Sequence, residues 1–277
     1  MKKQDAKLLS RKQKFLRSVL RIFSTVILIV VGVYIWNPQR IHFGEPRKMP
    51  PINHGVTEAS FIKKDSRITV VVGHPDDAEF FVSGTLLKLH EAGAKITLIL
   101  VTDGDKGYYP FFLTNAEENR RIRRQEQRDA SAAYGAELVF LGGPDGRYNP
   151  DEPELRAKLL EAMKASNPDY ILTFDSECLP QVQHRDHENS GRAASELARE
   201  TSAKALLLFA TTSPNLVVDT SKYWPIREKL LAVHKSQFYD DKLEMIKGMV
   251  HSRTIEAAED TKFELGEAYR VVPLNKK

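Results

Sequence analysis

Short runs of β-branched and apolar residues alternate with helical segments from residue 67 to the end of the chain. The clearest strand-like runs are 67–73, 95–102, 137–141, 169–174 and 205–210, with shorter ones at 215–218 and 268–272. Segments of helical composition lie between them, at 79–92, 115–134, 154–165, 186–200, 222–235 and 240–250. This alternation predicts an α/β fold with a Rossmann-like, mostly parallel sheet and helices on both faces. Ligands of such folds bind beyond the carboxyl ends of the strands.

An uncharged apolar stretch precedes this region, from Ile22 to Trp36, and reaches 18 residues when it is counted from Val19. A helix of that length spans ~27 Å, close to the ~30 Å hydrocarbon core of a bilayer. We therefore expect one N-terminal transmembrane helix, a signal anchor at 19–36, after a basic arm at 1–18. The positive-inside rule places the arm in the cytoplasm and the rest of the chain outside it.

Two other interpretations of the apolar stretch are a cleaved signal peptide and a soluble helix. The sequence Asn37-Pro-Gln-Arg40 lacks the small residues of a cleavage site. A dense basic arm is unusual in front of a buried helix. Both features favour the uncleaved anchor, which makes the protein a single-pass membrane protein with an extracytoplasmic catalytic domain.

Charge is divided unevenly along the chain. Residues 1–36 hold eight Lys and Arg side chains against Asp5 alone, so they contribute +7 to a total of +4 and leave −3 on the remainder. A slightly acidic body argues against a nucleic-acid partner. Residues 37–65 contain four prolines and little periodicity, which predicts a tether, and residues 66–277 are expected to form one catalytic domain. The single cysteine, Cys178, cannot form an internal disulfide.

Two clusters of His and carboxylate residues follow the first and fourth predicted strands. The first is HPDDAE at 74–79, and the second is QHRDHEN at 183–189. Strand ends in a parallel sheet lie at one edge, so the clusters are expected to meet. A catalytic zinc site takes three nitrogen or oxygen ligands and keeps one position open for water. One carboxylate of the adjacent pair Asp76 and Asp77 can bind the metal while the other takes a proton from water.

The same residues could instead have purely structural roles. Asp76 could cap a helix, and His184 and His187 could form a solvated helix face one turn long. Two such clusters at matching strand ends are more consistent with a functional site. Asp103 and Asp105 follow the second strand and would border the same cleft, where they could contact substrate or only form a turn.

The two clusters together resemble the PIG-L (LmbE-like) family of zinc-dependent N-acetylglucosaminyl deacetylases. HPDDAE at 74–79 with HRDH at 184–187 is the specific part of the match. Weaker matches are RRQE at 123–126, LGGPDG at 141–146, HKSQ at 234–237 and EAYR at 267–270. The resemblance covers roughly residues 66–273. Where many members have Gly-Gly and Pro, this chain has Ser83-Gly84 and Arg185, and these departures concern the identity of the substrate.

The family resemblance implies roles for individual residues. It implies that Zn²⁺ is bound by His74, Asp77 and His187. It implies Asp76 as the general base and His184 as the residue that stabilises the oxyanion or protonates the leaving amine. Asp186 would orient His187 or His184. Arg123 would be a candidate for contacting the sugar.

The resulting hypothesis is a membrane-anchored, zinc-dependent hydrolase that removes an N-acetyl group from an amino sugar in a surface glycan or glycolipid. One alternative is a zinc amidase for another amide, such as a thiol-sugar conjugate. Another is an inactive, glycan-binding homologue. A Mg²⁺-dependent nucleotide-sugar transferase is less consistent with a His-rich set. The sequence leaves the sugar and the oligomeric state open.

Overall fold

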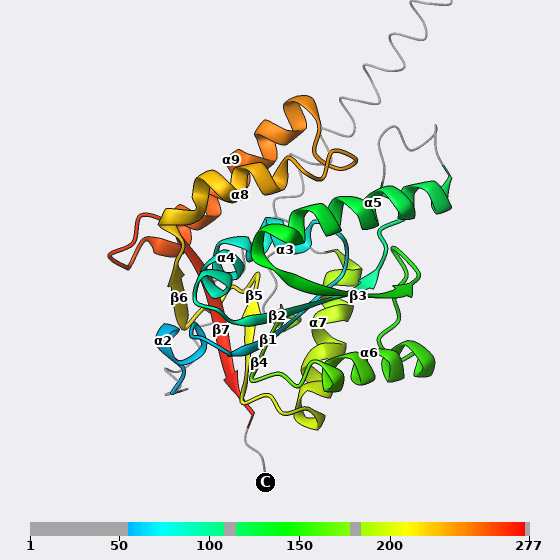
Figure 1. Cartoon of the computed structure of the whole chain (residues 1–277), viewed down its shortest axis with the longest axis horizontal. Helices are drawn as coiled ribbons and strands as arrows, with labels where there is room; N and C mark the ends of the chain where they lie inside the picture. The colour runs from blue at the N-terminus through cyan, green and yellow to red at the C-terminus, as the bar shows by residue number, and fades with distance from the viewer. Residues whose placement is uncertain (1–54, 108–114, 178–183, 275–277) are drawn as a thin grey trace, which may run out of the picture. The chain divides into compact units, whose positions relative to one another are not determined.

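The computed structural model describes residues 55–107, 115–177 and 184–274, which all belong to one compact unit, Pro46–Lys277. Seven strands form a single sheet in the order β3-β2-β1-β4-β5-β7-β6 (Figure 1). Five of them pair in parallel: β1 Arg67–Val72, β2 Lys95–Thr102, β3 Ala136–Gly143, β4 Tyr170–Phe174 and β5 Ala205–Phe209. The strand β7, Gly266–Pro273, is antiparallel both to β5 and to β6, Leu216–Asp219.

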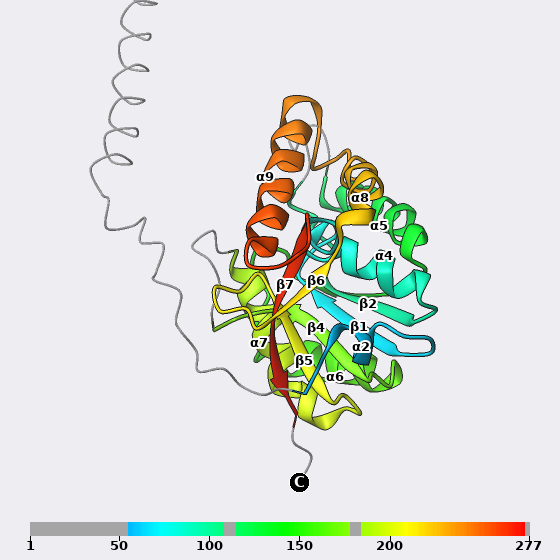
Figure 2. The same ribbon diagram turned by 90° about the vertical axis from the view of Figure 1, so that its left-hand side faces the viewer.

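Helices cover both faces of this sheet, as the alternation predicts (Figures 1 and 2). One apolar core lies under α4 (Ser83–Glu91), α5 (Ala116–Ser131) and α8 (Trp224–Leu231). The other lies under α6 (Pro153–Ala165) and α7 (Arg185–Leu197). Alternate residues of one strand supply the two cores: Val70 and Val72 of β1 face the first, and Val71 faces the second. Burial on both faces explains why Val70, Val71 and Val72 are apolar without alternation.

The strand order places β1 next to β4, although about 100 residues separate them in the chain. From β1 the chain builds the sheet outward in one direction through β2 and β3, and from β4 in the other direction through β5. Such a reversal is the topological switch point at which open α/β sheets bind ligands. The loops that follow β1 and β4 carry the two polar clusters, so the fold brings them together.

The region predicted as one helix at 79–92 forms two helices, α3 (Asp77–Phe81) and α4, which are separated at Val82. The carboxylate of Glu267 on β7 accepts hydrogen bonds from the backbone N–H groups of Gly84 and Thr85, at 2.9 and 2.8 Å. A side chain distant in sequence thus satisfies the first turn of α4, where N–H groups have no partner within the helix. This is a tertiary contact, which local sequence does not indicate.

The final part of the predicted tether differs from the expectation. Residues Glu58–Phe61 form the short helix α2, and the side chain of Phe61 is fully buried, with its ring 5.9 Å from that of Tyr170 on β4. The folded unit therefore begins before residue 66. The remainder of the tether, residues 37–54, lies outside the described residues.

The predicted basic arm and membrane anchor, residues 1–36, also lie outside the described residues. Within the three ranges that the structure describes, every helix is too short or too polar to be a membrane-span candidate. The anchor accordingly stays a prediction from sequence.

Close packing between α7 and β4 allows a test of the fold. A Cβ atom on Gly191 of α7 would lie 2.4 Å from the backbone oxygen of Phe174. We expect Gly191→Ala to lower the free energy of unfolding by about 1–3 kcal/mol, because the helix must move off the strand. Gly248 of α9 (Asp240–Ala258) is the matched control, since a Cβ there meets nothing within 4 Å. Gly248→Ala should stabilise by about 0.5–1 kcal/mol. Denaturant titration measures both, and equal effects would contradict this packing.

Candidate metal centre and active site

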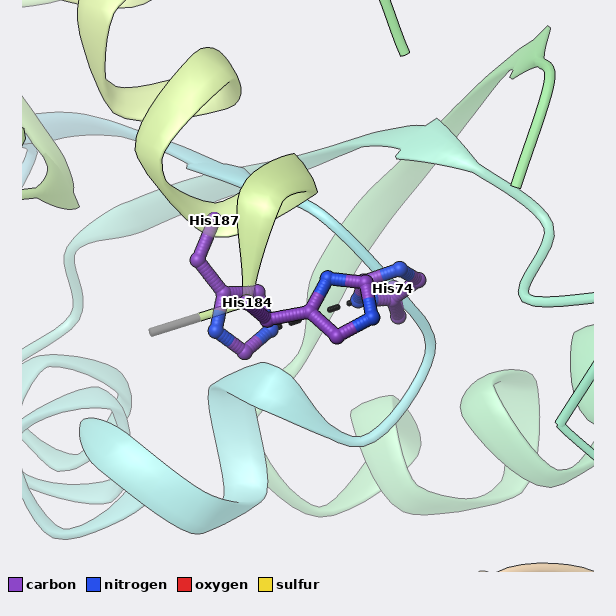
Figure 3. Close-up of side chains that lie close together, drawn as sticks. All are labelled: His74, His184 and His187. Carbon is purple, nitrogen blue, oxygen red and sulfur yellow. Dashed lines mark hydrogen bonds between the residues drawn. The ribbon is translucent and has the colours of Figure 1, made fainter. Parts of the chain in front are cut away.

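Three histidine rings gather where β1 and β4 end (Figure 3). His74 follows β1 directly after Gly73, whereas His184 is the N-cap residue of α7 and His187 lies in its first turn. The ring centroid of His74 is 4.6 Å from that of His184 and 5.2 Å from that of His187. Phe174, the last residue of β4, stacks on His187 at 4.3 Å with an interplanar angle of 6°, which fixes the orientation of that ring.

The atoms of His74, Asp77 and His187 have the spacing of a metal ligand set. His74 Nδ1 lies 3.3 Å from His187 Nε2, and the two oxygens of Asp77 lie 3.0 Å from His187 Nε2 and 3.7 Å from His74 Nδ1. Zn²⁺ at 2.0–2.1 Å from nitrogen or oxygen ligands in a tetrahedron separates them by roughly 3.4 Å. The distances from His187 Nε2 to His74 Nδ1 and to one Asp77 oxygen are close to this value, so these three residues could hold a zinc ion. The rings of His74, His184 and His187 also bring three nitrogens to metal-ligand spacing.

The opposite nitrogen of His74 faces two carboxylates. His74 Nε2 lies 3.1 Å from Asp145 Oδ1 and 3.2 Å from Asp186 Oδ2. Both carboxylates also accept backbone N–H groups, Asp145 from Lys106 at 2.8 Å and Asp186 from Tyr148 at 3.0 Å. These three side chains could form a metal group of their own. The carboxylates already serve as hydrogen-bond acceptors, however, so we interpret them as supports that keep the ring proton on Nε2 and leave Nδ1 for the metal.

Electrostatics at the centre favour a cation. Burial alone lowers the pKa of His74, but its hydrogen bonds with Asp145, Asp186 and Asp77 outweigh burial and raise that pKa well above its ordinary value. Burial alone would raise the pKa of Asp77, yet His187 and His74 bring it far below its ordinary value. Without a metal, the ionised carboxylates thus favour a protonated His74, and a bound divalent metal would compensate the same negative charge in place of that proton.

Asp76 lies beside this centre and does not ligate within it. It occupies the N-cap position of α3, but its side chain makes no capping hydrogen bond with that helix among the described residues, so the cap interpretation does not hold. Its Oδ2 accepts a hydrogen bond from Arg123 Nη2 at 2.9 Å. Burial raises the pKa of the Asp76 carboxyl and the charge of Asp77 raises it further, while Arg123 opposes the shift. A carboxylate with a raised pKa is suited to accept a proton near neutral pH.

His184 is the exposed member of the histidine group. Its Nδ1 accepts the backbone N–H of Asp186 at 3.3 Å, which leaves Nε2 to carry the proton of a neutral ring. Burial lowers the pKa of His184, and the neighbouring His74 and His187 lower it further. A neutral, exposed imidazole can donate a hydrogen bond to an oxyanion at the mouth of the site.

The three residues predicted to contact substrate make hydrogen bonds and ion pairs within the protein. Arg123 is buried, and its guanidinium donates to the backbone oxygen of Gly104 at 2.7 Å as well as to Asp76. Asp103 is buried and binds Arg124 through both oxygens, at 2.7 and 2.9 Å, and Asp105 pairs with Arg120 at 2.7 Å. These contacts fasten the loop after β2 to α5, and the role of the three side chains in substrate binding stays a prediction.

Two further residues differ from the sequence expectation. The carboxylate of Asp186 contacts His74, not His187 or His184, because the loop after β3 and the start of α7 lie on the Nε2 side of that ring. Asp145 contacts the same nitrogen and was not among the predicted site residues. The LGGPDG segment indicated Asp145, because that segment ends β3 and continues into the loop at the same edge of the sheet. Of the two departures from the family pattern, Ser83 is buried and Arg185 is exposed next to His184, so Arg185 borders the site.

Comparison with known proteins agrees with this geometry. Residues 69–198 match the model of the family described as PIG-L, GlcNAc-PI de-N-acetylase. A diacetylchitobiose deacetylase of Thermococcus kodakarensis is 23% identical over 224 residues, which cover 75% of this chain and 83% of that protein. A probable N-acetyl-alpha-D-glucosaminyl L-malate deacetylase 2 of Bacillus anthracis is 26% identical over 193 residues, 64% of this chain and 84% of that protein.

Among solved structures, the N,N'-diacetylchitobiose deacetylase of Pyrococcus horikoshii superimposes with a TM-score of 0.70 and 25% identity, over 76% of this chain and 85% of that one. These matches confirm the resemblance found in the sequence: residues 69–198 match the PIG-L family model, and the similar proteins are named as deacetylases.

Zinc binding tests the ligand set. We expect the full-length chain to bind one zinc ion and to gain thermal stability from it, because a ligand that binds the native state stabilises it. His187→Ala should weaken zinc affinity by more than the roughly 10–100-fold that follows loss of an outer partner. His90→Ala, at an exposed position of α4, is the control and should bind as the wild type does. Chelator competition measures the affinities, and wild-type affinity in His187→Ala would exclude this ligand set.

Proposed function

We propose that this protein is a zinc-dependent N-deacetylase that acts on an amino-sugar glycoconjugate. The main support is the convergence of three ligand atoms, from His74, Asp77 and His187, with the unliganded carboxylate of Asp76 beside them. The relatives named above are deacetylases of N-acetylated sugar compounds, which supports the acetamido group as the target. The family match supports the same reaction class.

The chain's own residues suit each step of acetamide hydrolysis. Zn²⁺ would supply Lewis-acid polarisation of the carbonyl and acidification of water. Asp76 accepts the proton of the attacking water, whose oxygen forms a bond to the acetyl carbon. His184 donates a hydrogen bond to the oxyanion that develops on the carbonyl oxygen. The proton held by Asp76 is then available to the sugar nitrogen as the C–N bond breaks, and the products are acetate and the free amine.

Acetate release is the direct test. The full-length chain should release acetate from N,N'-diacetylchitobiose or from an N-acetylglucosamine glycolipid, and a chelator should abolish the release. Asp76→Asn should lower kcat by about 10²–10⁴-fold, because the variant keeps the shape of the side chain but cannot accept the proton. Asp260→Asn, the same change at an exposed position, should have no effect.

Other outcomes of the same assay distinguish the rival functions. Bound zinc with release of a larger acyl product instead of acetate would favour an amidase for another conjugate. Sugar binding without any turnover in the presence of zinc would favour an inactive homologue. Either result would contradict the proposed reaction.

We further propose that the protein is anchored in a membrane by residues 19–36, with its catalytic domain outside the cytoplasm. The support is the sequence alone: an 18-residue apolar stretch preceded by a strongly basic arm. On this proposal, the amino sugar belongs to a surface glycan or a glycolipid.

Reporter fusions test this topology. A reporter that is active only outside the cytoplasm should be active when it is fused after Lys277. The fusion should remain in the membrane fraction after a high-salt wash, because an inserted helix is not released by screening of charges. Deletion of residues 1–36 should retain the reporter in the cytoplasm. Activity of a cytoplasm-only reporter at the same position would show that the proposed topology is wrong.

A further inference from the structure

We infer that Gln127 of α5 is a positioning residue for the deacetylation reaction, because its side-chain carbonyl holds the backbone of Asp76 in an unfavourable conformation that aims the general base. The inference rests on the proposed function, in which Asp76 takes the proton from water. It concerns a residue of α5 that touches neither the ligand set nor an open surface.

The backbone of Asp76 adopts a conformation that is rare for a residue with a Cβ atom. Its φ is 106° and its ψ is −21°. Such angles persist only where the surroundings impose them, and they concentrate at functional sites. The consequence here is geometric. Asp77 directs its carboxylate to His74 and His187, while that of Asp76, one residue earlier, is directed to Arg123.

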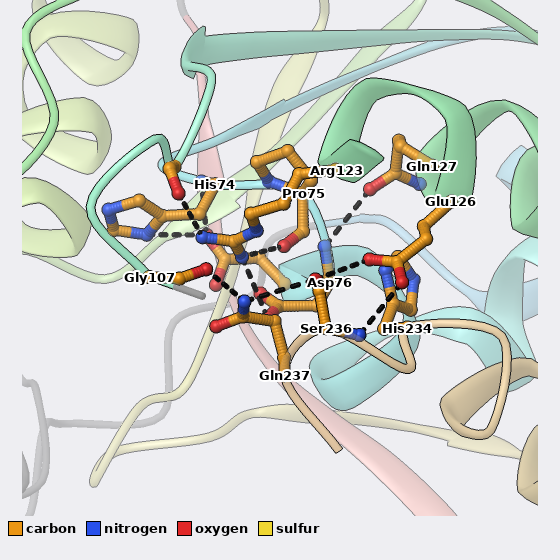
Figure 4. Close-up of polar contacts among 12 residues, drawn as sticks. His74, Pro75, Asp76, Gly107, Arg123, Glu126, Gln127, His234, Ser236 and Gln237 are labelled. Atoms are coloured by element: carbon orange, nitrogen blue, oxygen red, sulfur yellow. Dashed lines mark hydrogen bonds and ion pairs between the residues drawn. The ribbon is translucent and has the colours of Figure 1, made fainter. Parts of the chain in front are cut away.

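Gln127 supplies the contact that imposes this conformation. Its Oε1 accepts the backbone N–H of Asp76 at 3.0 Å (Figure 4). Arg123, one helical turn earlier on the same face of α5, binds the Asp76 carboxylate at 2.9 Å and the backbone oxygen of Pro75. One helix therefore fixes both the backbone and the side chain of Asp76. Gln127 and Arg123 are both buried, so the contacts that hold Asp76 from this side are shielded from solvent.

The orientation of the Gln127 amide is itself determined by what lies behind it. Its Nε2 donates to the carboxylate of Glu79, at 3.1 and 3.3 Å to the two oxygens. Glu79 is fully buried and also accepts hydrogen bonds from Tyr134 at 2.6 Å and from His234 Nε2 at 3.0 Å. A flipped amide would place its oxygen against this carboxylate, so the network keeps Oε1 directed toward Asp76. His234 of the HKSQ segment thereby helps to position Asp76. It binds Glu79, which orients the Gln127 amide that accepts the Asp76 N–H.

Three variants of the full-length chain separate positioning from packing. Gln127→Met keeps the volume and removes the acceptor, and Gln127→Asn keeps the amide but shortens its reach. We expect kcat per bound zinc to fall about 10–100-fold in both, as is typical when a catalytic group moves by about 1 Å. KM and zinc affinity should stay within about twofold, because the ligands are untouched. Gln125→Met is the matched control on the exposed face of α5 and should leave all three quantities unchanged.

Two further measurements distinguish a positioning role of Gln127 from a role in packing alone. Tyr134→Phe removes a neighbour from the Glu79 network but leaves the Gln127 carbonyl in place, so it should lower thermal stability with kcat per bound zinc reduced less than about threefold. Hydrogen exchange at the Asp76 amide should be at least tenfold faster in Gln127→Met than in Gln125→Met, whatever the substrate. Unchanged kcat per bound zinc, an equal loss in Tyr134→Phe, or unchanged exchange would overturn the inference. Absence of acetate release in the wild type would instead contradict the proposed function, and the exchange experiment would still test the contact.

Discussion

The parallel pairing of β1 with β4 is the contact on which the site depends. It places the ends of two strands from distant parts of the chain side by side at the switch point of the sheet. His74 and His187 meet there, although 113 residues separate them in sequence. The close approach of Gly191 to Phe174 keeps α7 against β4, and Phe174 in turn stacks on His187. Packing that stabilises the fold thus also positions a candidate metal ligand.

The two ring nitrogens of His74 face different groups of residues, and these groups have different roles. Its Nδ1 faces Asp77 and His187, whereas its Nε2 faces Asp145 and Asp186. Carboxylates on the Nε2 side fix the tautomer of the ring and increase its basicity toward a metal. The same arrangement gathers several buried negative charges, which are tolerated where a cation or a proton compensates them. A metal bound at this site would therefore also affect local stability.

Helix α5 packs against the proposed base, Asp76, and holds it by two hydrogen bonds. Its arginines bind Asp103 and Asp105 and so fasten the loop after β2, while Arg123 and Gln127 hold Asp76. A highly charged helix of this kind looks like a solvated surface element in sequence, but its polar residues Asn119, Arg123 and Gln127 are buried. The charge of Arg123 also opposes the rise in the pKa of Asp76 that burial causes, so one contact sets both the position of the carboxyl group and its basicity.

Sequence alone determined the α/β class, the strands and the edge at which the site lies, because periodicity and strand-end motifs depend on local residues. The family resemblance also implied that His74, Asp77 and His187 form one ligand group. Tertiary structure decided what each remaining side chain contacts. It made Asp186 and Asp145 partners of His74, and it placed the Arg123 guanidinium against the Asp76 carboxylate. It also brought Glu267 to the start of α4 and Phe61 into the core. The physical reason is that hydrogen-bond partners across a fold depend on strand order and helix packing, which local pattern does not contain.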